Sequence, residues 1–430
     1  MDVVVRKPHL RNCVSQENEL LLRKYRNLLI EKALQDPSRT LDESYNLVVQ
    51  QMAINDPNYV ATFPRRDRFA TRYNKTIRRI NPAIPEDLAV LEIPAPFNTF
   101  QGQPFVLHQE TFAHNGRNET ILVFGTERFM EALLTRSPVV GMDGTFKVVP
   151  APFYQLFTIH FIWLRRALPG IYCLLTSKTE AIYNRLFEWL REYCAGMNWN
   201  LVWNTIKIDF ESGLIPSLEF NFPEIMPFHG CYYHFCSCVY RYAVDHLGLG
   251  TAYRNPETHV KRYVKLLMAL GFLPVHQVIE EFENLRDNEF PFQENDAETV
   301  AKLHELNDYF RYYWLGVGQG QGPHQSPETC NVYQEDNRTN NDLEGWHNKL
   351  NKQVGLNCIL WKFIKSLKVM QGFAEADFAR ILRGEAITKQ KKKYRDINER
   401  LRDLAVLLEA GNIDVQHYLL SVSNELGFAE

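Results

Sequence analysis

The strongest constraint on the fold is a change of sequence pattern over residues 120–210. Short β-prone runs separated by polar, glycine or proline residues are followed by one amphipathic helix and one further strand. Hairpin-connected runs, a crossover helix and a strand beside the first run predict a mixed sheet in an α/β domain. The expected strands are 120–124, 138–149, 154–163, 170–177 and 204–210, and the expected helix is 179–195.

Three acidic residues occupy special positions in this pattern. Asp143 lies where one strand emerges, Asp209 ends another strand, and Glu344 lies near the start of a polar helix expected over 340–353. If the two strands are adjacent and parallel, both aspartates project from one end of the sheet, where α/β proteins bind ligands. The helix, with Asn340 or its neighbour as a plausible cap, can bring Glu344 alongside them.

Three carboxylates at one place indicate a metal site. They repel one another strongly unless cations neutralise them, and hard oxygen ligands suit Mg²⁺ or Mn²⁺. Two such ions would activate a water or a 3′-hydroxyl, with Asp143 bridging both ions and Asp209 and Glu344 each holding one. Each acid alone is more often a solvated charge or a cap. The joint pattern favours a ribonuclease H-like core for phosphodiester chemistry.

Helical segments flank and interrupt this core. Helices are expected at 235–247, 256–270, 273–286 and 297–315, so an all-helical insertion of about 235–315 lies before Glu344. The predicted organisation is a helical N-terminal region over 1–104, a core over 105–355 and a helical C-terminal region over 356–430.

The N-terminal region contains a basic stretch over 65–80 that follows helices at 17–36 and 41–54 and precedes a proline-rich linker over 81–104. Apolar residues recur between its charges at helical spacing. It is interpreted either as a phosphate-binding helix or as a solvated face of a small bundle. The candidate DNA-binding residues are Arg65, Arg66, Arg68, Arg72, Lys75, Arg78 and Arg79, together with Arg338.

Cys231 and His234 form a Cys-x₂-His pair after the second aspartate. This pair is either half of a zinc site or an active-site brace. Structural zinc needs four ligands, and no second Cys/His pair appears at the usual spacing, so zinc is not expected and a packed thiol and imidazole are favoured. His347 lies on the same helical face as Glu344 and is expected either to contact a metal-bound phosphate or to hydrogen-bond Glu344.

Bulk composition limits the remaining possibilities. The net charge of −3 means that any DNA contact comes from local patches. Eight scattered cysteines and a polar N-terminus without a signal peptide predict a reducing, intracellular setting. The most apolar stretch, 153–175, is interrupted by charged residues and proline, so no membrane span is expected.

Four motifs in order resemble those of the Mutator-like element (MULE) transposases, closest to the animal branch that often carries an N-terminal FLYWCH-type zinc finger. They are Met-Asp-Gly-Thr-Phe-Lys at 142–147, Asp-Phe-Glu at 209–211, Cys-x₂-His at 231–234 and Arg-x-Asn-Asn-x-x-Glu-x-x-His at 338–347. The resemblance covers about 105–370, and no zinc finger is visible before residue 105. It implies a DDE transposase with Asp143, Asp209 and Glu344 as catalytic and metal-binding residues, and Cys231 and His234 as the family pair.

The aspartates are 66 residues apart, and Asp209 and Glu344 are 135 residues apart. The second separation is too long for a plain crossover, so it agrees with the helical insertion that the resemblance implies. The function expected is metal-dependent DNA strand cleavage and strand transfer by a nuclear protein that forms a homo-oligomer on DNA. One alternative is a domesticated, non-catalytic DNA-binding or chromatin-associated protein that keeps the fold. Another is a general metal-dependent nuclease.

Overall fold

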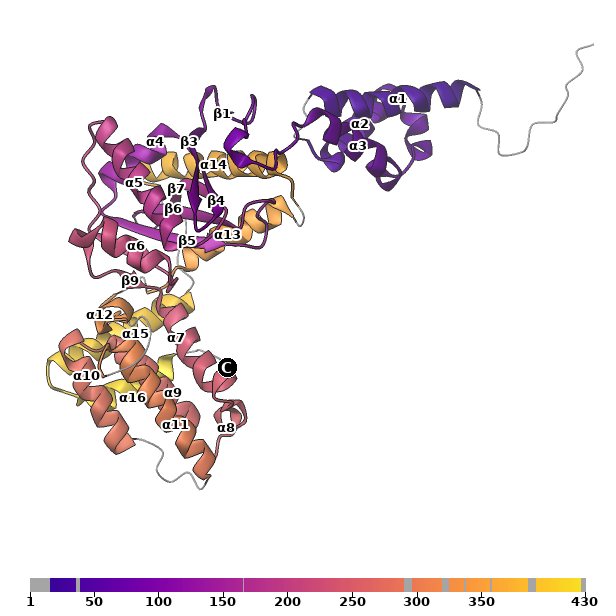
Figure 1. Cartoon of the computed structure of the whole chain (residues 1–430). Helices are drawn as coiled ribbons and strands as arrows, with labels where there is room; N and C mark the ends of the chain where they lie inside the picture. The colour runs from indigo at the N-terminus through magenta and orange to yellow at the C-terminus, as the bar shows by residue number, and fades with distance from the viewer. Residues whose placement is uncertain are drawn as a thin grey trace, which may run out of the picture. The chain divides into compact units, whose positions relative to one another are not determined.

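The structure is a computed structural model that describes residues 16–35, 39–164, 166–289, 296–318, 325–335, 338–355, 358–385 and 392–426. Two compact units make up the chain (Figure 1). The first unit comprises Met1–Phe97 and Cys358–Ser366, and the second comprises Asn98–Asn357 and Leu367–Glu430.

The first unit is a small helical bundle made of α1 (Gln16–Gln35), α2 (Leu41–Asn55) and α3 (Ala70–Ile80), with 3₁₀ turns at Pro57–Thr62 and Arg66–Phe69. Helix α2 begins with a capping box, in which the Thr40 hydroxyl accepts from the Glu43 backbone N–H and the Glu43 carboxylate accepts from the Thr40 backbone N–H. All three helices contribute to one apolar core that includes Tyr25, Met52 and Tyr73.

In the basic stretch over 65–79, the large apolar side chains lie in the core and the basic side chains lie in the solvent. Phe69, Tyr73 and Ile77 recur every four residues and are buried. The seven candidate DNA-binding side chains between 65 and 79 are all exposed. Arg66 forms an ion pair with Asp42, with Nη1 2.6 Å from Oδ1. The stretch therefore forms an amphipathic helix with an exposed cationic face.

The second unit contains a seven-stranded mixed sheet in the order β3-β4-β7-β6-β5-β8-β9. The pairs from β3 to β5 are antiparallel, and β8 is parallel to both β5 and β9. The strands are β3 (Val106–His114), β4 (Arg117–Gly125), β5 (Val139–Thr145), β6 (Gln155–Trp163), β7 (Arg166–Leu175), β8 (Thr205–Ile208) and β9 (His229–Gly230). The predicted α/β class and mixed sheet are confirmed.

One long edge strand and one short hairpin fall outside the strands expected from the sequence. Strand β3 was not expected, because it lies at an edge and its half-exposed residues lack a clear apolar alternation. The expected linker over 81–104 contains a short hairpin of β1 (Thr99–Phe100) and β2 (Gln103–Pro104). Both differences concern strands with little buried surface of their own.

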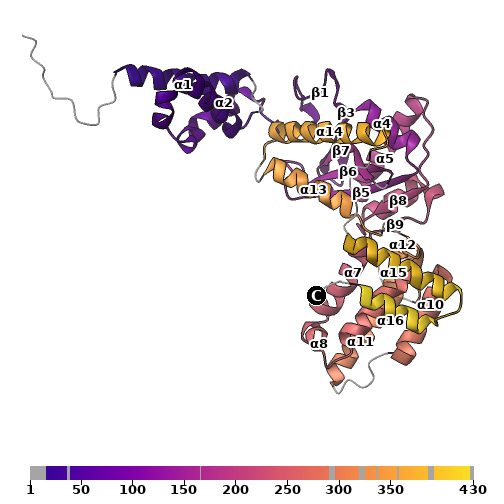
Figure 2. The ribbon, with the colours of Figure 1, turned by 180° about the vertical axis from the view of Figure 1, so that it is seen from behind.

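Helices cover both faces of the sheet. Helix α5 (Glu180–Gly196) packs on one face, where the Tyr183 ring lies 5.1 Å from that of Phe157 on β6. Helix α13 (Asn341–Val354) and the part of helix α14 (Leu360–Leu382) that belongs to the second unit lie along the other face (Figure 2). There Tyr172 on β7 stacks on Trp346 at 5.5 Å and donates a 2.9 Å hydrogen bond to Gln371.

The register of the strands identifies the residues whose side chains face α13. Asp143 on β5 pairs with Thr158 on β6, and Thr158 pairs with Tyr172 on β7. Paired residues of neighbouring strands share a face of the sheet. Asp143, Thr158 and Tyr172 therefore form one lateral row that faces α13.

A helical region completes the second unit and has its own apolar core, to which Trp314, Leu401 and Tyr418 belong. Its helices are α7 (Tyr232–Arg241), α8 (Gly250–Arg254), α9 (Val260–Ala269), α10 (Val275–Asn284), α11 (Ala297–Tyr309), α12 (Pro327–Cys330), α15 (Lys392–Glu409) and α16 (Val415–Glu425). The smaller helices α4 (Glu127–Glu131) and α6 (Leu214–Asn221) belong to the sheet region.

The C-terminal helices differ from the organisation expected over 356–430. Helices α15 and α16 join the core of the helical insertion, and the Tyr418 hydroxyl donates a 2.8 Å hydrogen bond to the Phe272 carbonyl. The later part of α14 packs on the sheet through Ala374 and Phe378. The described part of this segment therefore completes other parts of the chain and forms no separate unit. Of the described helices, none is long and apolar enough to cross a membrane.

Candidate metal centre

The two aspartates meet where adjacent parallel strands end. Strands β5 and β8 pair directly, with Gly141 opposite Lys207. Asp143 lies two residues beyond Gly141 on β5, and Asp209 follows the last residue of β8. Burial raises the pKa of Asp209, the His234 contact acts in the opposite direction, and the neighbouring carboxylate of Asp143 raises it further. The two carboxylates therefore lie in mutual electrostatic contact.

Helix α13 brings Glu344 to the same place through a close approach to β5. A Cβ atom on Gly141 would lie 3.0 Å from Leu343 Cδ2, tighter than most side-chain contacts. Glycine therefore lets the first turn of α13 lie directly over the strand. Asn340 precedes α13 as expected, but its side chain does not cap the helix. Instead it donates a 3.0 Å hydrogen bond to Asp209 Oδ1.

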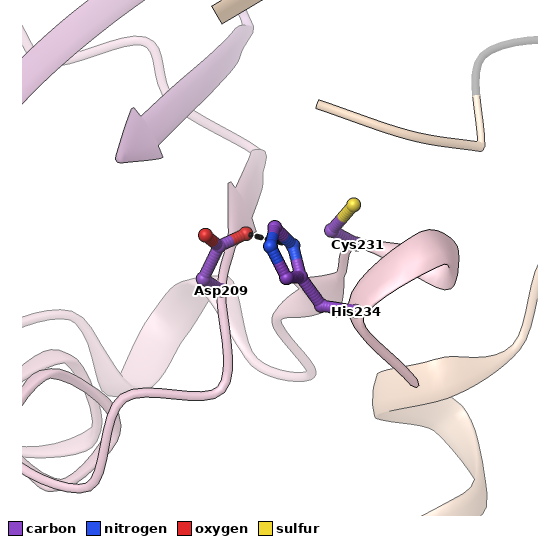
Figure 3. A group of neighbouring side chains, drawn as sticks. All are labelled: Asp209, Cys231 and His234. Atoms are coloured by element: carbon purple, nitrogen blue, oxygen red, sulfur yellow. Dashed lines mark ion pairs between the residues drawn. The ribbon is translucent and has the colours of Figure 1, made fainter. Parts of the chain in front are cut away.

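His234 lies between two of the three acids (Figure 3 shows its contact with Asp209). Its Nδ1 is 2.8 Å from Asp209 Oδ1, and its Nε2 is 3.8 Å from Glu344 Oε1. Burial acts to lower the pKa of His234, but the contacts with Asp209 and Cys231 outweigh burial and raise it to about 11. An imidazolium at this position supplies positive charge that the clustered carboxylates otherwise lack.

Cys231 lies beside the same imidazole. Among the described residues, the possible ligand atoms of Asp209, Cys231 and His234 all lie within 4.8 Å of one another. The cysteine immediately precedes α7, and its backbone N–H donates to the Ile208 carbonyl at 2.8 Å. The Cys-x₂-His pair therefore lies at a strand-to-helix junction, and its histidine contacts Asp209.

His347 faces Asp143, not Glu344. Its side chain is buried, and Nδ1 lies 2.9 Å from Asp143 Oδ2. The hydrogen bond observed is therefore with Asp143 and not with Glu344, and contact with a metal-bound phosphate stays a prediction. His347 Nε2 lies 3.1 Å from Thr158 Oγ1, and His160 Nε2 also lies 3.1 Å from that oxygen. The Thr158 hydroxyl itself donates to the Asp143 backbone carbonyl at 3.2 Å. These contacts fix the orientation of the Asp143 carboxylate.

Three further residues of the site were not recognised in the sequence: Glu211, Thr158 and His160. Glu211 is a fourth acid, which accepts a 2.6 Å hydrogen bond from the Tyr183 hydroxyl. Burial raises the pKa of Glu211, and the charges of Asp209 and Asp143 add to this effect. The Asp-x-Glu spacing could have indicated Glu211, because alternate residues of an extended chain lie on the same side and Glu211 would then lie beside Asp209. Thr158 and His160 carried no signal, because their role depends on strand register.

The acids of this region approach one another in pairs. Asp209 lies close to Asp143 and Glu211, and His234 lies between Asp209 and Glu344. Among the described residues, the three predicted acids do not form a group whose ligand atoms all lie within 4.8 Å of one another. Clustered carboxylates are nevertheless donors of the type that Mg²⁺ and Mn²⁺ prefer.

The candidate DNA-binding residues fall into two groups. The seven basic residues of 65–79 are exposed in the first unit. Arg338 is half-buried in the second unit, where Nη2 donates to Asn398 Oδ1 at 2.7 Å and the guanidinium lies over the Phe272 ring at 5.1 Å. Those contacts give Arg338 a packing role in the helical core, and its contact with DNA stays a prediction.

The fold and the site together describe an α/β protein in which Asp143 and Asp209 lie near the ends of adjacent parallel strands, with Cys231 and His234 beside Asp209. Residues 139–238 match the family model of the MULE transposase domain. The matched stretch runs from β5 into α7 and contains Asp143, Asp209, Cys231 and His234; Glu344 lies beyond it.

The match supports the Mutator-like resemblance, and a transposase domain implies interaction with DNA. The animal FLYWCH-associated branch stays a prediction. Comparison with curated proteins gave no significant match.

Proposed function

We propose that the chain is a DDE-type transposase of the Mutator-like class, which cleaves DNA and transfers the cleaved strand with Mg²⁺ or Mn²⁺. The observation that carries the proposal is the convergence of three acids from distant segments. Asp209 touches His234, which lies within 3.8 Å of Glu344, and Asp143 acts electrostatically on Asp209. Separate segments rarely bring like charges together without a ligand that needs them.

The proposed roles follow from the contacts of each acid. Asp143, Asp209 and Glu344 would hold two divalent ions, and such ions would supply activation of a water or a 3′-hydroxyl and stabilisation of the leaving oxygen. Asp143 is buried and oriented by His347, whereas the Glu344 side chain is 35% exposed. Glu344 therefore lies on the side from which DNA would approach, and Asp143 forms the fixed base of the site.

The topology supports a ribonuclease H-like core. Strands β5, β6 and β7 form an antiparallel meander, and β8 and β9 continue the sheet in parallel on the other side of β5. This order presents Asp143 and Asp209 on neighbouring strands, and the helices from α7 to α12 fall between Asp209 and Glu344 in the sequence. The core with a helical insertion is thus the architecture that we propose.

DNA binding would come from the cationic face of the first unit. Arg68, Arg72, Lys75 and Arg79 recur at helical spacing opposite the buried Phe69, Tyr73 and Ile77. Such a stripe suits the regular spacing of backbone phosphates. Joining two element ends requires two sites, so we include a homo-oligomer on DNA and a nuclear location in the proposal.

The test is Mn²⁺-dependent nicking of supercoiled DNA by the purified full chain. Wild type should nick, Asp209→Asn should lose about 10³-fold or more of the rate, and both should bind DNA equally. Glu219→Gln, which changes an exposed acid on α6, serves as the matched control and should behave as wild type. Absence of nicking by the wild type, with DNA binding intact, would overturn the proposal and identify a non-catalytic DNA-binding protein.

Strand transfer needs a second assay. A pre-cleaved duplex with a free 3′-hydroxyl should become joined to a target plasmid in the presence of Mn²⁺. Nicking without joining, and without preference for element ends, would instead identify a general metal-dependent nuclease.

A further inference from the structure

We infer that Asp209, Cys231 and His234 form a binding site for one borderline-soft divalent cation, of the kind represented by Zn²⁺ and Co²⁺. This inference goes beyond the proposed function, because it rests on the donor set alone and holds whether or not the chain cleaves DNA. Oxygen, sulfur and nitrogen donors from three residues all lie within 4.8 Å of one another (Figure 3).

The His234 ring faces the other two donors through a buried nitrogen. His234 Nδ1 lies 2.8 Å from Asp209 Oδ1, which is an ion-pair distance. Because metal ligands must be deprotonated, a cation at this place would replace the proton that lies between these two atoms.

One neighbouring residue orients two of the three donors. Asn340 is buried; its backbone N–H donates to Cys231 Sγ at 3.3 Å, and its side-chain amide donates to Asp209 Oδ1 at 3.0 Å. Hydrogen bonds of this type hold metal ligands in position. The same residue therefore prepares both donors for a cation.

The backbone around Cys231 fixes the thiol at the helix entrance. Its N–H extends the pairing of β9 with β8 through the Ile208 carbonyl at 2.8 Å. The next residue, Tyr232, donates from its N–H to the Arg338 carbonyl at 2.9 Å, which ties the segment before α13 to the start of α7. The thiol therefore lies at the N-terminus of a ten-residue helix, in a position fixed by backbone hydrogen bonds on both sides.

The donor set determines the class of ion. Thiolate and imidazole favour Zn²⁺, Co²⁺ and other borderline or soft ions, whereas Mg²⁺ prefers oxygen ligands. Binding would release the protons of the Cys231 thiol and the His234 ring to solvent, so the ion takes their place. Three protein ligands leave open positions for water or a phosphate oxygen.

Asp209 belongs to both this site and the proposed hard-ion pair. A Zn²⁺ ion at this position therefore competes with Mg²⁺ for one carboxylate.

Co²⁺ is the probe, because a thiolate ligand gives Co²⁺ a charge-transfer band in the near ultraviolet that oxygen and nitrogen ligands do not give. The purified full chain, reduced and free of metal, would be titrated with Co²⁺ alone. Wild type should show the band with saturation at one ion per chain. Cys231→Ser should lose the band, and His234→Ala should weaken Co²⁺ binding at least about tenfold.

Cys238→Ser is the matched control, since Cys238 lies on the same helix and is half-buried. It should keep both the band and the affinity. Far-ultraviolet circular dichroism would establish that each variant is folded. Because no DNA is present, a failure of the cleavage proposal leaves this test unaffected.

Absence of the band from folded wild type would overturn the inference. Its persistence in Cys231→Ser, or its loss in Cys238→Ser, would equally overturn the assignment. Full wild-type affinity in folded His234→Ala would remove the imidazole from the ligand set and contradict the three-donor site.

Discussion

The basic helix of the first unit and the acidic centre of the second differ in how their charges are held. The charged side chains of 65–79 are exposed, with Arg66 in a single surface ion pair. The acids of the centre are buried or half-buried, and Asp143 and Asp209 each contact a histidine directly. Exposed charges act almost independently and are screened by salt, whereas buried charges act through their partners.

The two regions should therefore respond differently to the loss of one charge. Removing one charge from the exposed basic helix lowers a DNA affinity to which several similar charges contribute. Removing one acid from the centre changes the balance of charge around every remaining group. Five predictions, in order of decreasing expected effect, examine this contrast.

The largest effect is expected for Glu344→Gln, which keeps the size of the side chain and removes its charge. Mn²⁺-dependent nicking should fall about 10³-fold, because one ion loses its ligand. DNA binding, measured by fluorescence anisotropy, should stay within about twofold, because the cationic face is untouched. A large loss of DNA binding would show that the two regions do not act separately.

The next effect is expected for the double variant Arg72→Ala/Arg79→Ala. DNA affinity should fall at least about tenfold, and the slope of log K against log salt should decrease by about two. Mn²⁺ binding without DNA should be unchanged. Arg23→Ala/Arg26→Ala removes the same charge from exposed positions on α1 and should have a smaller effect. Equal losses in both variants would mean that net charge, not α3, governs binding.

An intermediate effect is expected for His347, and two amide variants separate its two contacts. The Asn side chain places its amide where Nδ1 lies, so His347→Asn can still donate to Asp143, whereas His347→Gln reaches toward Thr158 instead. Mn²⁺ affinity should fall about tenfold in His347→Gln and by less in His347→Asn. Equal losses in the two variants would contradict a positioning role through Nδ1.

A pair of glycines tests the close approach of α13 to β5. Gly141→Ala should destabilise the second unit by about 1–3 kcal/mol, because its Cβ would press on Leu343. Gly345→Ala, on the same helix, has open space around its Cβ and should be neutral or stabilising by up to about 1 kcal/mol. Chemical denaturation of the full chain gives both values. A neutral Gly141→Ala would show that α13 can shift without cost.

The smallest effect concerns acid stability. Burial lowers the pKa of His160 well below its ordinary value, and the charge of His347 adds to this. The unfolded chain binds a proton at His160 below about pH 6.5 and the folded chain does not, so stability is full above that pH and falls below it. His160→Gln should reduce the loss of stability between about pH 7.5 and about pH 5.5 by roughly 1 kcal/mol. An unchanged loss would contradict a neutral buried imidazole.

Much of the sheet could be predicted from the sequence because its central strands are buried. Strands β5, β6 and β7 have long apolar runs, and α5 has a clear helical period, so each lies close to its expected range. Strand β3 was missed because an edge strand needs no apolar pattern. The placement of α15 and α16 was missed because an amphipathic helix does not specify its partner.

The residues of the site also fall into two groups, those that local sequence patterns indicate and those that depend on tertiary contacts. The positions of Asp143 and Asp209 relative to strands follow from local patterns, so the sequence indicates both. The contact of His347 with Asp143, and the contacts of Thr158 with His347 and His160, depend on strand register and on how α13 crosses the sheet. Asn340 was expected to cap a helix, but its amide bonds Asp209 instead, because the buried carboxylate needs a donor.

The most direct test of the central claim is the number of Mn²⁺ ions bound at the carboxylate centre, measured by electron paramagnetic resonance on the full chain with a DNA duplex. Wild type should bind about two ions per chain, and Asp143→Asn should lose both, because that residue is proposed to bridge them. Unchanged Mn²⁺ binding in a folded Asp143→Asn variant would contradict the metal centre described for this chain.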